Sequence, residues 1–410
     1  MDLDRRTLLI TLSGNDRPGV TRRLFATLDA HPVTVLDVEQ LVVRGRLVLA
    51  VLVEVTGPDD VMAAVRTAVR HTAAELDMDV DTVPGAAEDD ERRRNRIHIT
   101  LLGAPLTPGA VADAAAEIAD RGGNIDRIRR IASYPVTAIE FQGSGVAVED
   151  LRRPLAFIAA RHGADIAVQE AGLDRRGQYL VVMDVDSTFI QDEVIDLLAD
   201  EAGVLPAVAE ITERAMAGEL DFEQSLRARV ALLADLPETA LERVRERITL
   251  TPGARTLTRT LSRLGYRVAL VSGGFTEIIA PIAAELGVTD VRANTLEIID
   301  GRLTGAVTGP VIDRLGKKSA LEAFARQYGI PSRRTIAIGD GANDVDMLAA
   351  AGLGIAFNAK AAARDVADTS VNVPYLDSVL FLMGITREEI ESADARDGIA
   401  SVTPEVPRTR

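Results

Sequence analysis

Residues 179–188 read YLVVMDVDST, an apolar run that is followed at once by two aspartates. A short, continuous apolar run of this kind is typical of a strand that is buried on both faces of a parallel sheet. Asp184 and Asp186 come directly after the run, so we place them at the carboxyl end of this strand. Ligands bind at that edge in open α/β sheets. The stretch therefore predicts an α/β core with an acidic site at one edge.

Three more short apolar runs predict strands of the same sheet: 267–271, 335–338 and 354–357. Strands that alternate with helices imply a parallel sheet with helices on both faces. Two of these strands end in polar segments, Ser272 with Gly273, and the run GDGAND at 339–344. Acidic groups gathered at one edge repel one another unless a cation lies among them, and Mg²⁺ prefers oxygen ligands and phosphate. We therefore expect a magnesium site that handles phosphate.

The composition restricts the chemistry of this site. The chain has 410 residues, no cysteine and four histidines, and these are His31, His71, His98 and His162. Thiolate nucleophiles and cysteine–zinc sites are therefore excluded, and the region of the expected site has no histidine base of its own. Carboxylates are left to serve as nucleophile and proton carrier.

Charge and hydropathy indicate the setting in which the protein works. The net charge of −16 argues against nucleic acid as a partner, because phosphate backbones attract basic surfaces. No apolar run approaches the roughly 20 residues of a membrane span, and the charged residues 1–6 are unlike a signal peptide. We therefore expect a cytoplasmic protein with neither a membrane nor a nucleic-acid partner.

Two segments near the N-terminus look like copies of one unit. Residues 8–14 lead to Pro18, residues 97–103 lead to Pro108, and a helix pattern and a strand pattern follow in each copy. We predict two tandem βαββαβ units of the α+β ferredoxin-like type. The charged stretch 86–96 reads as a linker between them.

The expected domains follow from these patterns: 1–88, 89–174 and 175–386. A helical insertion at about 193–250 separates the first two strands of the third domain and forms a cap. A hairpin is expected at 296–307, with its turn at Asp300 and Gly301. The last residues, 387–410, are polar and weakly periodic, so we expect a disordered tail.

Four segments together resemble the motifs of the haloacid dehalogenase superfamily over about residues 179–383: DVDST at 184–188, Ser272 with Gly273, Lys317, and GDGAND at 339–344. The resemblance implies a Rossmann-like parallel-sheet core with Asp184 as the nucleophile. It also implies Asp186 as the general acid and base, a residue that marks the phosphatase branch. Mg²⁺ is then held by the carboxylates of Asp184 and Asp340 and by the backbone carbonyl of Asp186.

The same resemblance assigns the groups that hold phosphate. Ser272 and Gly273 bind phosphate oxygens, and Lys317 places positive charge over the transferring group. Asn343 contacts either phosphate or substrate. Asp344 orients either Lys317 or a metal-bound water, and both roles stay open.

The helical insertion resembles the cap of the phosphoserine phosphatase family, with matching residues from Glu193 to about residue 233. The resemblance implies that Glu193 faces the substrate ammonium and Arg229 its carboxylate, a pairing that suits a zwitterion. Met216 and Phe222 then close over the pocket. The implied reaction hydrolyses O-phospho-L-serine through an aspartyl-phosphate, as the last step of serine biosynthesis.

Two other interpretations stay open. A phosphatase of wider specificity, acting on small molecules or phosphoproteins, uses the same chemistry. An amino-acid-binding regulator with an inactive catalytic domain is a different class, and the presence of Asp184, Asp186, Lys317 and Asp340 argues against it.

The loop NDRPGV at 15–20 resembles the effector loop of ACT domains, which bind amino acids. The resemblance implies an amino-acid effector, with serine expected, at Asp16, Gly19 and Val20. Free N–H groups at the start of the following helix attract a carboxylate, and proline suits the first helical turn. We expect this effector to inhibit the distant catalytic site.

The second copy departs from this loop. Pro108 and Gly109 are kept, so Gly109 is a candidate effector contact, but Leu106 and Thr107 replace the acidic and basic pair of the first copy. Effector binding by the second copy is therefore in doubt. We expect a homodimer through these domains, and a purely structural dimerisation module is the alternative.

Overall fold

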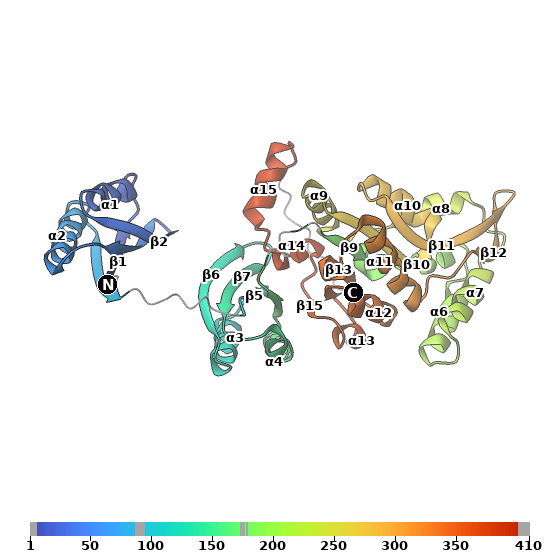
Figure 1. Ribbon diagram of the computed structural model, residues 1–410. Helices are drawn as coiled ribbons and strands as arrows, with labels where there is room; N and C mark the ends of the chain where they lie inside the picture. The colour runs from blue at the N-terminus through green and yellow to red at the C-terminus, as the bar shows by residue number, and fades with distance from the viewer. Residues whose placement is uncertain (1–5, 87–94, 173–176, 178, 401–410) are drawn as a thin grey trace. The chain divides into compact units, whose positions relative to one another are not determined.

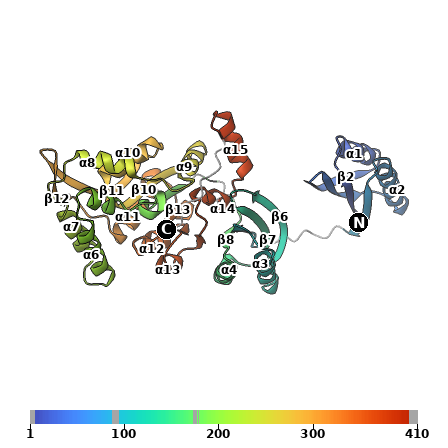
Figure 2. The same ribbon diagram turned by 180° about the vertical axis from the view of Figure 1, so that it is seen from behind.

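The computed structural model describes residues 6–86, 95–172, 177 and 179–400, which form two compact units, Met1–Arg93 and Arg94–Arg410. Figures 1 and 2 show the elements of both units from opposite sides. Most of the expected linker, 87–94, lies outside the described residues.

The first unit has the predicted βαββαβ order. Its elements are β1 (Arg6–Asn15), α1 (Val20–Asp29), β2 (Val33–Val43), β3 (Arg46–Val55), α2 (Asp59–Glu75) and β4 (Asp79–Ala86). The sheet order is β2-β3-β1-β4, and all the pairs are antiparallel. Leu8, Ile10 and Leu12 of β1 are buried while Leu9 between them is 39% exposed. This alternation is that of a sheet with one covered face.

The second repeat has the same order, but the strands β5, β7 and β8 of its sheet are largely buried on both faces. Its elements are β5 (Ile97–Gly103), α3 (Pro108–Asp120), β6 (Asn124–Ala132), β7 (Thr137–Ser144), α4 (Val148–His162) and β8 (Asp165–Glu170). The sheet order β6-β7-β5-β8 matches that of the first repeat. Its second face packs on the catalytic domain: Thr369 Oγ1 donates to Ile166 O at 3.1 Å, and Gln169 Nε2 donates to Leu382 O at 2.8 Å.

The third domain is built on a seven-stranded sheet, in the order β12-β11-β10-β9-β13-β14-β15. The strands are β9 (Leu180–Met183), β10 (Arg267–Phe275), β11 (Asp290–Ile299), β12 (Arg302–Thr308), β13 (Thr335–Gly339), β14 (Leu353–Phe357) and β15 (Thr369–Val371). All neighbours are parallel except β11 and β12, which form the predicted hairpin through Asp300 and Gly301. The α/β fold class is thus confirmed.

Helices cover both faces of this sheet. Val181 and Met183 of β9 belong to one hydrophobic cluster, and Leu180 and Val182 to the other, because successive side chains point to opposite faces. The first cluster lies under α9 (Ala254–Arg263) and α10 (Thr276–Glu285). The second lies under α11 (Arg314–Tyr328), α12 (Val345–Ala350) and α13 (Ala361–Arg364). Burial on both faces explains the continuous apolar runs of the sequence.

The cap consists of four helices between β9 and β10: α5 (Val194–Glu201), α6 (Leu205–Met216), α7 (Phe222–Ala231) and α8 (Thr239–Arg247). Helix α7 begins at a capping box, in which Asp221 accepts from Gln224 N at 2.7 Å and the Gln224 side chain accepts from Asp221 N. The helices α6 and α7 lie at the β11–β12 end of the sheet (Figure 1), and α7 packs on β12.

The prediction of a disordered tail from residue 387 is wrong for the described part of it. Helix α15 (Arg387–Arg396) begins at a capping box formed by Thr386 and Glu389. Arg259 and Arg263 of α9 both bond to Asp394 of this helix, at 2.7 and 2.6 Å. Helix α15 is held against α9 by these charged pairs and not by a broad apolar face. Its hydrophobic periodicity is therefore weak. Residues 401–410 lie outside the described part.

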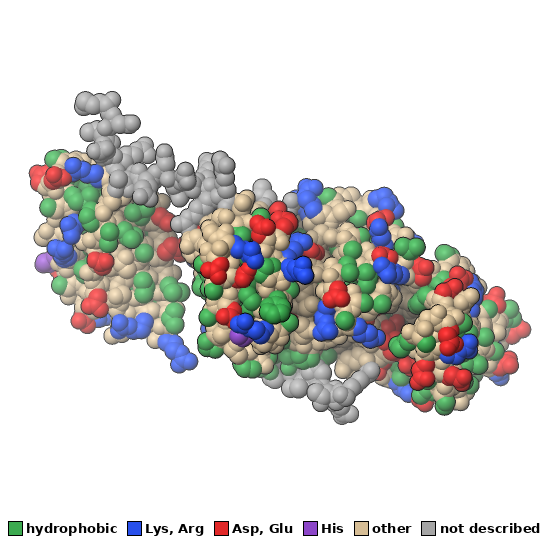
Figure 3. Space-filling view, turned by 90° about the horizontal axis from the view of Figure 1, so that it is seen from below, with side chains coloured by type: hydrophobic (Ala, Val, Ile, Leu, Met, Phe, Trp, Pro, Cys, Tyr) green, Lys and Arg blue, Asp and Glu red, His purple; other side chains and the backbone are tan. Residues whose placement is uncertain are grey.

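Among the helices of the described residues, none is long and apolar enough to cross a membrane. Acidic and basic side chains are interspersed over the face seen in Figure 3. They surround smaller groups of hydrophobic side chains on that face.

Candidate active site

Neighbouring strand ends bring the expected site residues together. Asp184 follows β9, Ser272 and Gly273 lie near the end of β10, and Asp340 follows β13. Since β10 and β13 flank β9 in parallel, their carboxyl ends meet at one edge. After Asp184 the chain makes a turn through Val185–Phe189, closed by a hydrogen bond from Ile190 N to Val185 O at 3.0 Å, which keeps Asp186 beside the strand end.

Asp184 and Lys317 form a buried ion pair. Lys317 Nζ, from α11, lies 2.6 Å from Asp184 Oδ1 and 2.8 Å from Asp344 Oδ1, and the lysine side chain is 1% exposed. Burial and the charge of Asp344 raise the pKa of Asp184, while Lys317 opposes this. Burial lowers the pKa of Lys317, but the two carboxylates outweigh it and raise that pKa overall. Lys318, the neighbouring candidate, points elsewhere: it is about half exposed beside Glu322.

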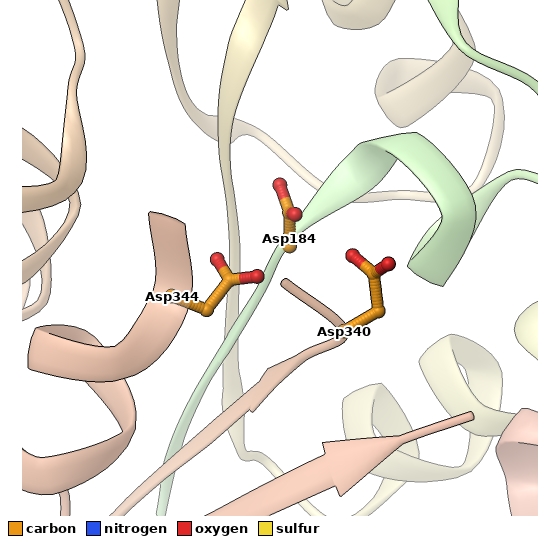
Figure 4. Close-up of side chains that lie close together, drawn as sticks. All are labelled: Asp184, Asp340 and Asp344. Atoms are coloured by element: carbon orange, nitrogen blue, oxygen red, sulfur yellow. The ribbon is translucent and has the colours of Figure 1, made fainter. Parts of the chain in front are cut away.

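Three carboxylates gather at this edge. One oxygen from each of Asp184, Asp340 and Asp344 lies within 4.8 Å of the others, and Figure 4 shows the groups converging on one region. Burial and the charge of Asp344 raise the pKa of Asp340 to about 6. A set of carboxylate oxygens with no soft ligand fits a hard divalent cation such as Mg²⁺. Asp344, for which the sequence left open a contact with Lys317 or with a metal-bound water, belongs to this cluster.

Both carboxylate oxygens of Asp186 accept hydrogen bonds from groups outside the carboxylate cluster. Its Oδ1 accepts from Val194 N at 2.8 Å, and its Oδ2 accepts from Ser272 Oγ at 3.0 Å. Burial and the nearby charge of Glu193 raise its pKa to about 6. A carboxyl group of this kind exchanges its proton near neutral pH, as a general acid and base must.

Glycines allow the close approaches that the site needs. A Cβ on Gly339 would lie 2.4 Å from Asp344 Cγ, so only glycine lets Asp344 reach Lys317. Asp344 Oδ2 also accepts from Gly341 N at 3.0 Å. The half-buried Asn343 lies beside Gly341, where a Cβ would meet its Oδ1 at 2.3 Å.

The cap reaches the site through Phe222. A Cβ on Gly273 would lie 3.0 Å from Phe222 Cζ, so the ring of this α7 residue lies over the end of β10. Gly273 O accepts from Asn294 Nδ2 at 2.8 Å, and Asn294 Oδ1 accepts from Ile312 N. Asn294 is buried and ties the end of β10 to the segment before α11. The sequence alone does not reveal this role, because a lone asparagine carries no local signal of a long-range contact.

Opposite charges lie beside Asp186 in the cap. Arg229 of α7 is half-buried; burial lowers its pKa, and the charges of Asp196, Glu193 and Asp186 oppose this. Glu193 precedes α5 and accepts from Ser187 Oγ at 2.8 Å. Met216, expected to close over the pocket, is 76% exposed at the end of α6, so this closure is not seen.

The loop at the start of α1 differs from its copy. Gly19 has φ 96°, precedes the helix, and a Cβ there meets nothing within 4 Å. Pro18 therefore lies before the helix and not in its first turn, contrary to expectation. Val20 is buried, and Asp16 N donates to Gly45 O at 2.8 Å.

The corresponding loop of the second repeat is filled. Thr107 Oγ1 accepts from Ala110 N at 3.3 Å and caps α3, whose first residue is Pro108. A Cβ on Gly109 would lie 3.0 Å from His162 Cε1, and His162 Nε2 lies 2.6 Å from Asp113 Oδ2. The residues of the second repeat itself therefore occupy the space beside this glycine.

Comparison with known proteins identifies the class that this fold and site define. Residues 181–349 match the model of haloacid dehalogenase-like hydrolases, and residues 6–83 and 97–169 match two models of ACT domains. The chain is 56% identical over 391 residues to a phosphoserine phosphatase of Streptomyces coelicolor, covering 95% of each chain. It is 51% identical over 401 residues to phosphoserine phosphatase SerB2 of Mycobacterium tuberculosis, covering 95% of this chain and 96% of the other. The chain belongs to the phosphoserine phosphatase family.

A solved structure agrees with this family. The unliganded probable phosphoserine phosphatase from Vibrio cholerae is 36% identical, with a TM-score of 0.57. The match covers 73% of this chain and 88% of that one. The fold class predicted from the sequence, a haloacid dehalogenase core with a cap and two ACT domains, is confirmed.

Proposed function

We propose that the chain hydrolyses O-phospho-L-serine to L-serine and phosphate through an aspartyl-phosphate on Asp184. The assignment of this substrate rests on the pair of opposite charges, Glu193 and Arg229, beside Asp186. A carboxylate and a guanidinium suit the ammonium and the carboxylate of an amino acid. The reaction completes serine biosynthesis.

Asp184 is the nucleophile. Its Oδ1 is held by Val185 N at 2.8 Å and by Lys317 Nζ at 2.6 Å, so the carboxylate is fixed in one orientation. A carboxylate oxygen attacks phosphorus, the bond to the serine oxygen breaks, and the phosphoryl group remains on Asp184. Lys317 favours the ionised form of Asp184, against burial and the charge of Asp344, and offsets charge on the transferring group.

Asp186 moves the proton in both half-reactions. It first protonates the departing serine oxygen, and as a carboxylate it then removes a proton from the water that attacks the aspartyl-phosphate. Its pKa near 6 suits both roles. Its bonds to Val194 N and Ser272 Oγ hold the carboxyl group beside the strand end.

Asp184 and Asp340, with the backbone carbonyl of Asp186, would hold Mg²⁺. The bound ion supplies positive charge that neutralises phosphate oxygens. Ser272, Gly273 and Asn343 bind phosphate oxygens at the same edge, and Phe222 covers the site from the cap. Asp344 orients Lys317, as their 2.8 Å contact supports.

The alternative is a phosphatase of wider specificity, for small molecules or phosphoproteins. Phosphate release from O-phospho-L-serine is compared with release from phosphoethanolamine, 3-(phosphonooxy)propanoate and a phosphoserine peptide. A kcat/KM for phosphoserine well above the other three supports the proposal. Equal values for all four would favour the alternative.

The first ACT domain is the sensor in this proposal. An amino acid, serine, binds with its carboxylate at the open N-terminus of α1, with contacts from Asp16, Gly19 and Val20. The uncapped helix and the empty space beside Gly19 support this site, whereas His162 fills the space beside Gly109. Serine then inhibits its own formation.

The exposed strand β2 supports a homodimer through the ACT domains. It is an edge strand, and six of its large apolar residues are at least 41% exposed: Val35, Leu36, Val38, Leu41, Val42 and Val43. Such an edge is prone to pair with another chain. A Leu41→Lys variant that shifts from dimer to monomer in sedimentation would agree with this, and an unchanged dimer would not.

A further inference from the structure

Ser187 follows Asp186 in an unusual backbone conformation. Its φ is 57° and its ψ is 2°, in the left-handed region that residues other than glycine rarely adopt, whereas Asp186 is extended at φ −63° and ψ 131°. The chain thus reverses direction between two successive residues of the site. Neither the metal nor the phosphate roles described above use the Ser187 side chain.

The reversal brings the Ser187 hydroxyl to Glu193. Oγ donates to Glu193 Oε1 at 2.8 Å, across six residues of sequence. Glu193 is exposed and precedes the first turn of α5, so close packing does not fix its side chain. The three side-chain torsions of a glutamate are otherwise free in water.

The backbone on both sides of this contact is held independently. Asp192 Oδ2 accepts from Thr249 N at 2.8 Å, and Gln191 N donates to Thr249 O at 2.8 Å. Val194 N donates to Asp186 Oδ1 at 2.8 Å. Removal of the Ser187 hydroxyl therefore leaves the loop in place and frees only the Glu193 side chain.

We infer that Ser187 is a positioning residue for substrate selection: its hydroxyl orients the Glu193 carboxylate toward the ammonium of the substrate. The inference rests on the proposed function, in which Glu193 recognises that ammonium. A carboxylate accepts several hydrogen bonds, so Glu193 accepts from Ser187 and from the ammonium together. An oriented carboxylate binds the ammonium without first losing side-chain freedom.

Two variants separate the hydroxyl from the backbone. Ser187→Ala and Ser187→Gly both lack the hydroxyl, but glycine adopts the positive φ freely and alanine does not. Equal effects of both variants assign the role to the hydroxyl. A loss in the alanine variant alone would assign it to the backbone and overturn the inference.

Three substrates report which part of the substrate is affected. Phosphoserine and phosphoethanolamine carry the ammonium, and 3-(phosphonooxy)propanoate does not. We expect both variants to raise KM roughly threefold to tenfold for the first two substrates, as one hydrogen bond implies, and to leave kcat and the third substrate unchanged. An equal loss on all three substrates would show a general structural defect and overturn the inference.

A double-mutant cycle with Glu193→Gln completes the test. If Ser187 acts through Glu193, then Ser187→Ala adds little to the KM of the Glu193→Gln enzyme. Fully additive effects would overturn the inference. The wild-type enzyme tests the proposed function without any variant. If it does not prefer phosphoserine over 3-(phosphonooxy)propanoate, then the proposed function and the inference on Ser187 are both rejected, whereas a preference that the variants do not alter would reject the inference alone.

Discussion

Lys317 and Asp184 form an ion pair that is almost entirely removed from water, with Nζ and Oδ1 2.6 Å apart and side chains 1% and 3% exposed. Asp344 makes a second contact with the same ammonium at 2.8 Å. Two buried carboxylates and one buried lysine leave an excess of negative charge. A divalent cation beside these carboxylates would offset this excess, which agrees with a metal-dependent site.

Asp184→Asn should abolish turnover while the fold is kept, because an amide cannot form the aspartyl-phosphate. We expect kcat to fall by at least about a thousandfold. Acid-quenched wild-type enzyme should carry the mass of one phosphoryl group, and the variant should not. A variant that still turns over with a phosphoryl adduct would place the nucleophile elsewhere.

The adjacent lysines give a matched comparison. Lys317→Ala removes the buried charge beside Asp184 and should lower kcat/KM by roughly 100-fold or more. It should also lower the melting temperature, because two buried carboxylates lose their partner. Lys318→Ala removes an exposed charge and should change kcat/KM less than about twofold. Comparable losses of kcat/KM in both variants would contradict the assignment of the catalytic lysine to the buried Lys317.

Arg229 and Arg227 give a second matched pair on α7. Arg229 is half-buried beside Asp186, whereas Arg227 is exposed and pairs with Glu223 one turn away. Arg229→Ala should raise KM for phosphoserine roughly 10- to 100-fold through lost hydrogen bonds to the substrate carboxylate. Arg227→Ala should have little effect. If Arg229→Ala leaves the preference for phosphoserine over phosphoethanolamine intact, then the substrate assignment of the cap is wrong.

Gly19→Val should abolish inhibition by serine, because a side chain at this position fills the open space before α1. The matched control is Gly163→Val, in the second repeat, since both glycines have positive φ and nothing within 4 Å of a Cβ. Initial rates at increasing serine concentration report the inhibition. Loss of inhibition in both variants would point to backbone strain, and its retention in Gly19→Val would exclude this loop.

Stability should depend on pH through Asp165, a β8 residue buried against the catalytic domain. Burial raises its pKa from 3.8 to about 6, although two bonds from Asn372 oppose this. The folded form therefore binds the proton more tightly, so this group favours folding in acid. Its contribution, about 3 kcal/mol for a shift of about two pH units, is lost as pH rises from 4 to 6.

Asp165→Asn should remove this dependence. Melting temperatures measured from pH 4 to pH 6 should fall more steeply with pH for the wild type than for the variant. Asp150→Asn, at an exposed site on α4, is the control and should follow the wild type. Parallel curves for wild type and Asp165→Asn would mean that Asp165 does not titrate in this range.

Local patterns predicted most of the elements. The strands at 180–183 and 335–339 appear where apolar runs placed them, and the hairpin turns at Asp300 and Gly301. Helix α15 was missed, although its capping box, Thr386 with Glu389, is visible in the sequence. Its stability depends on arginines of α9 that are more than 100 residues away, and no local pattern reports such a contact.

The sequence by itself determined where the acidic site lies. Aspartates directly after a buried parallel strand must lie at its carboxyl edge, and two neighbouring strands with polar ends must bring Ser272 and Asp340 to the same edge. These placements depend only on strand direction and the period of two, which local sequence encodes. The family resemblance then supplied Lys317, Glu193 and Arg229.

Only the tertiary structure decided which of the site residues contact one another. It placed Asp344 within the carboxylate cluster and against Lys317, turned Ser187 to Glu193, and left Met216 exposed. It also packed β5, β7 and β8 of the second ACT repeat against the catalytic domain while leaving β2 of the first one open. Both repeats encode the same βαββαβ order, but burial of their outer faces depends on partners far away in the chain, and such packing cannot be read from the period of one segment.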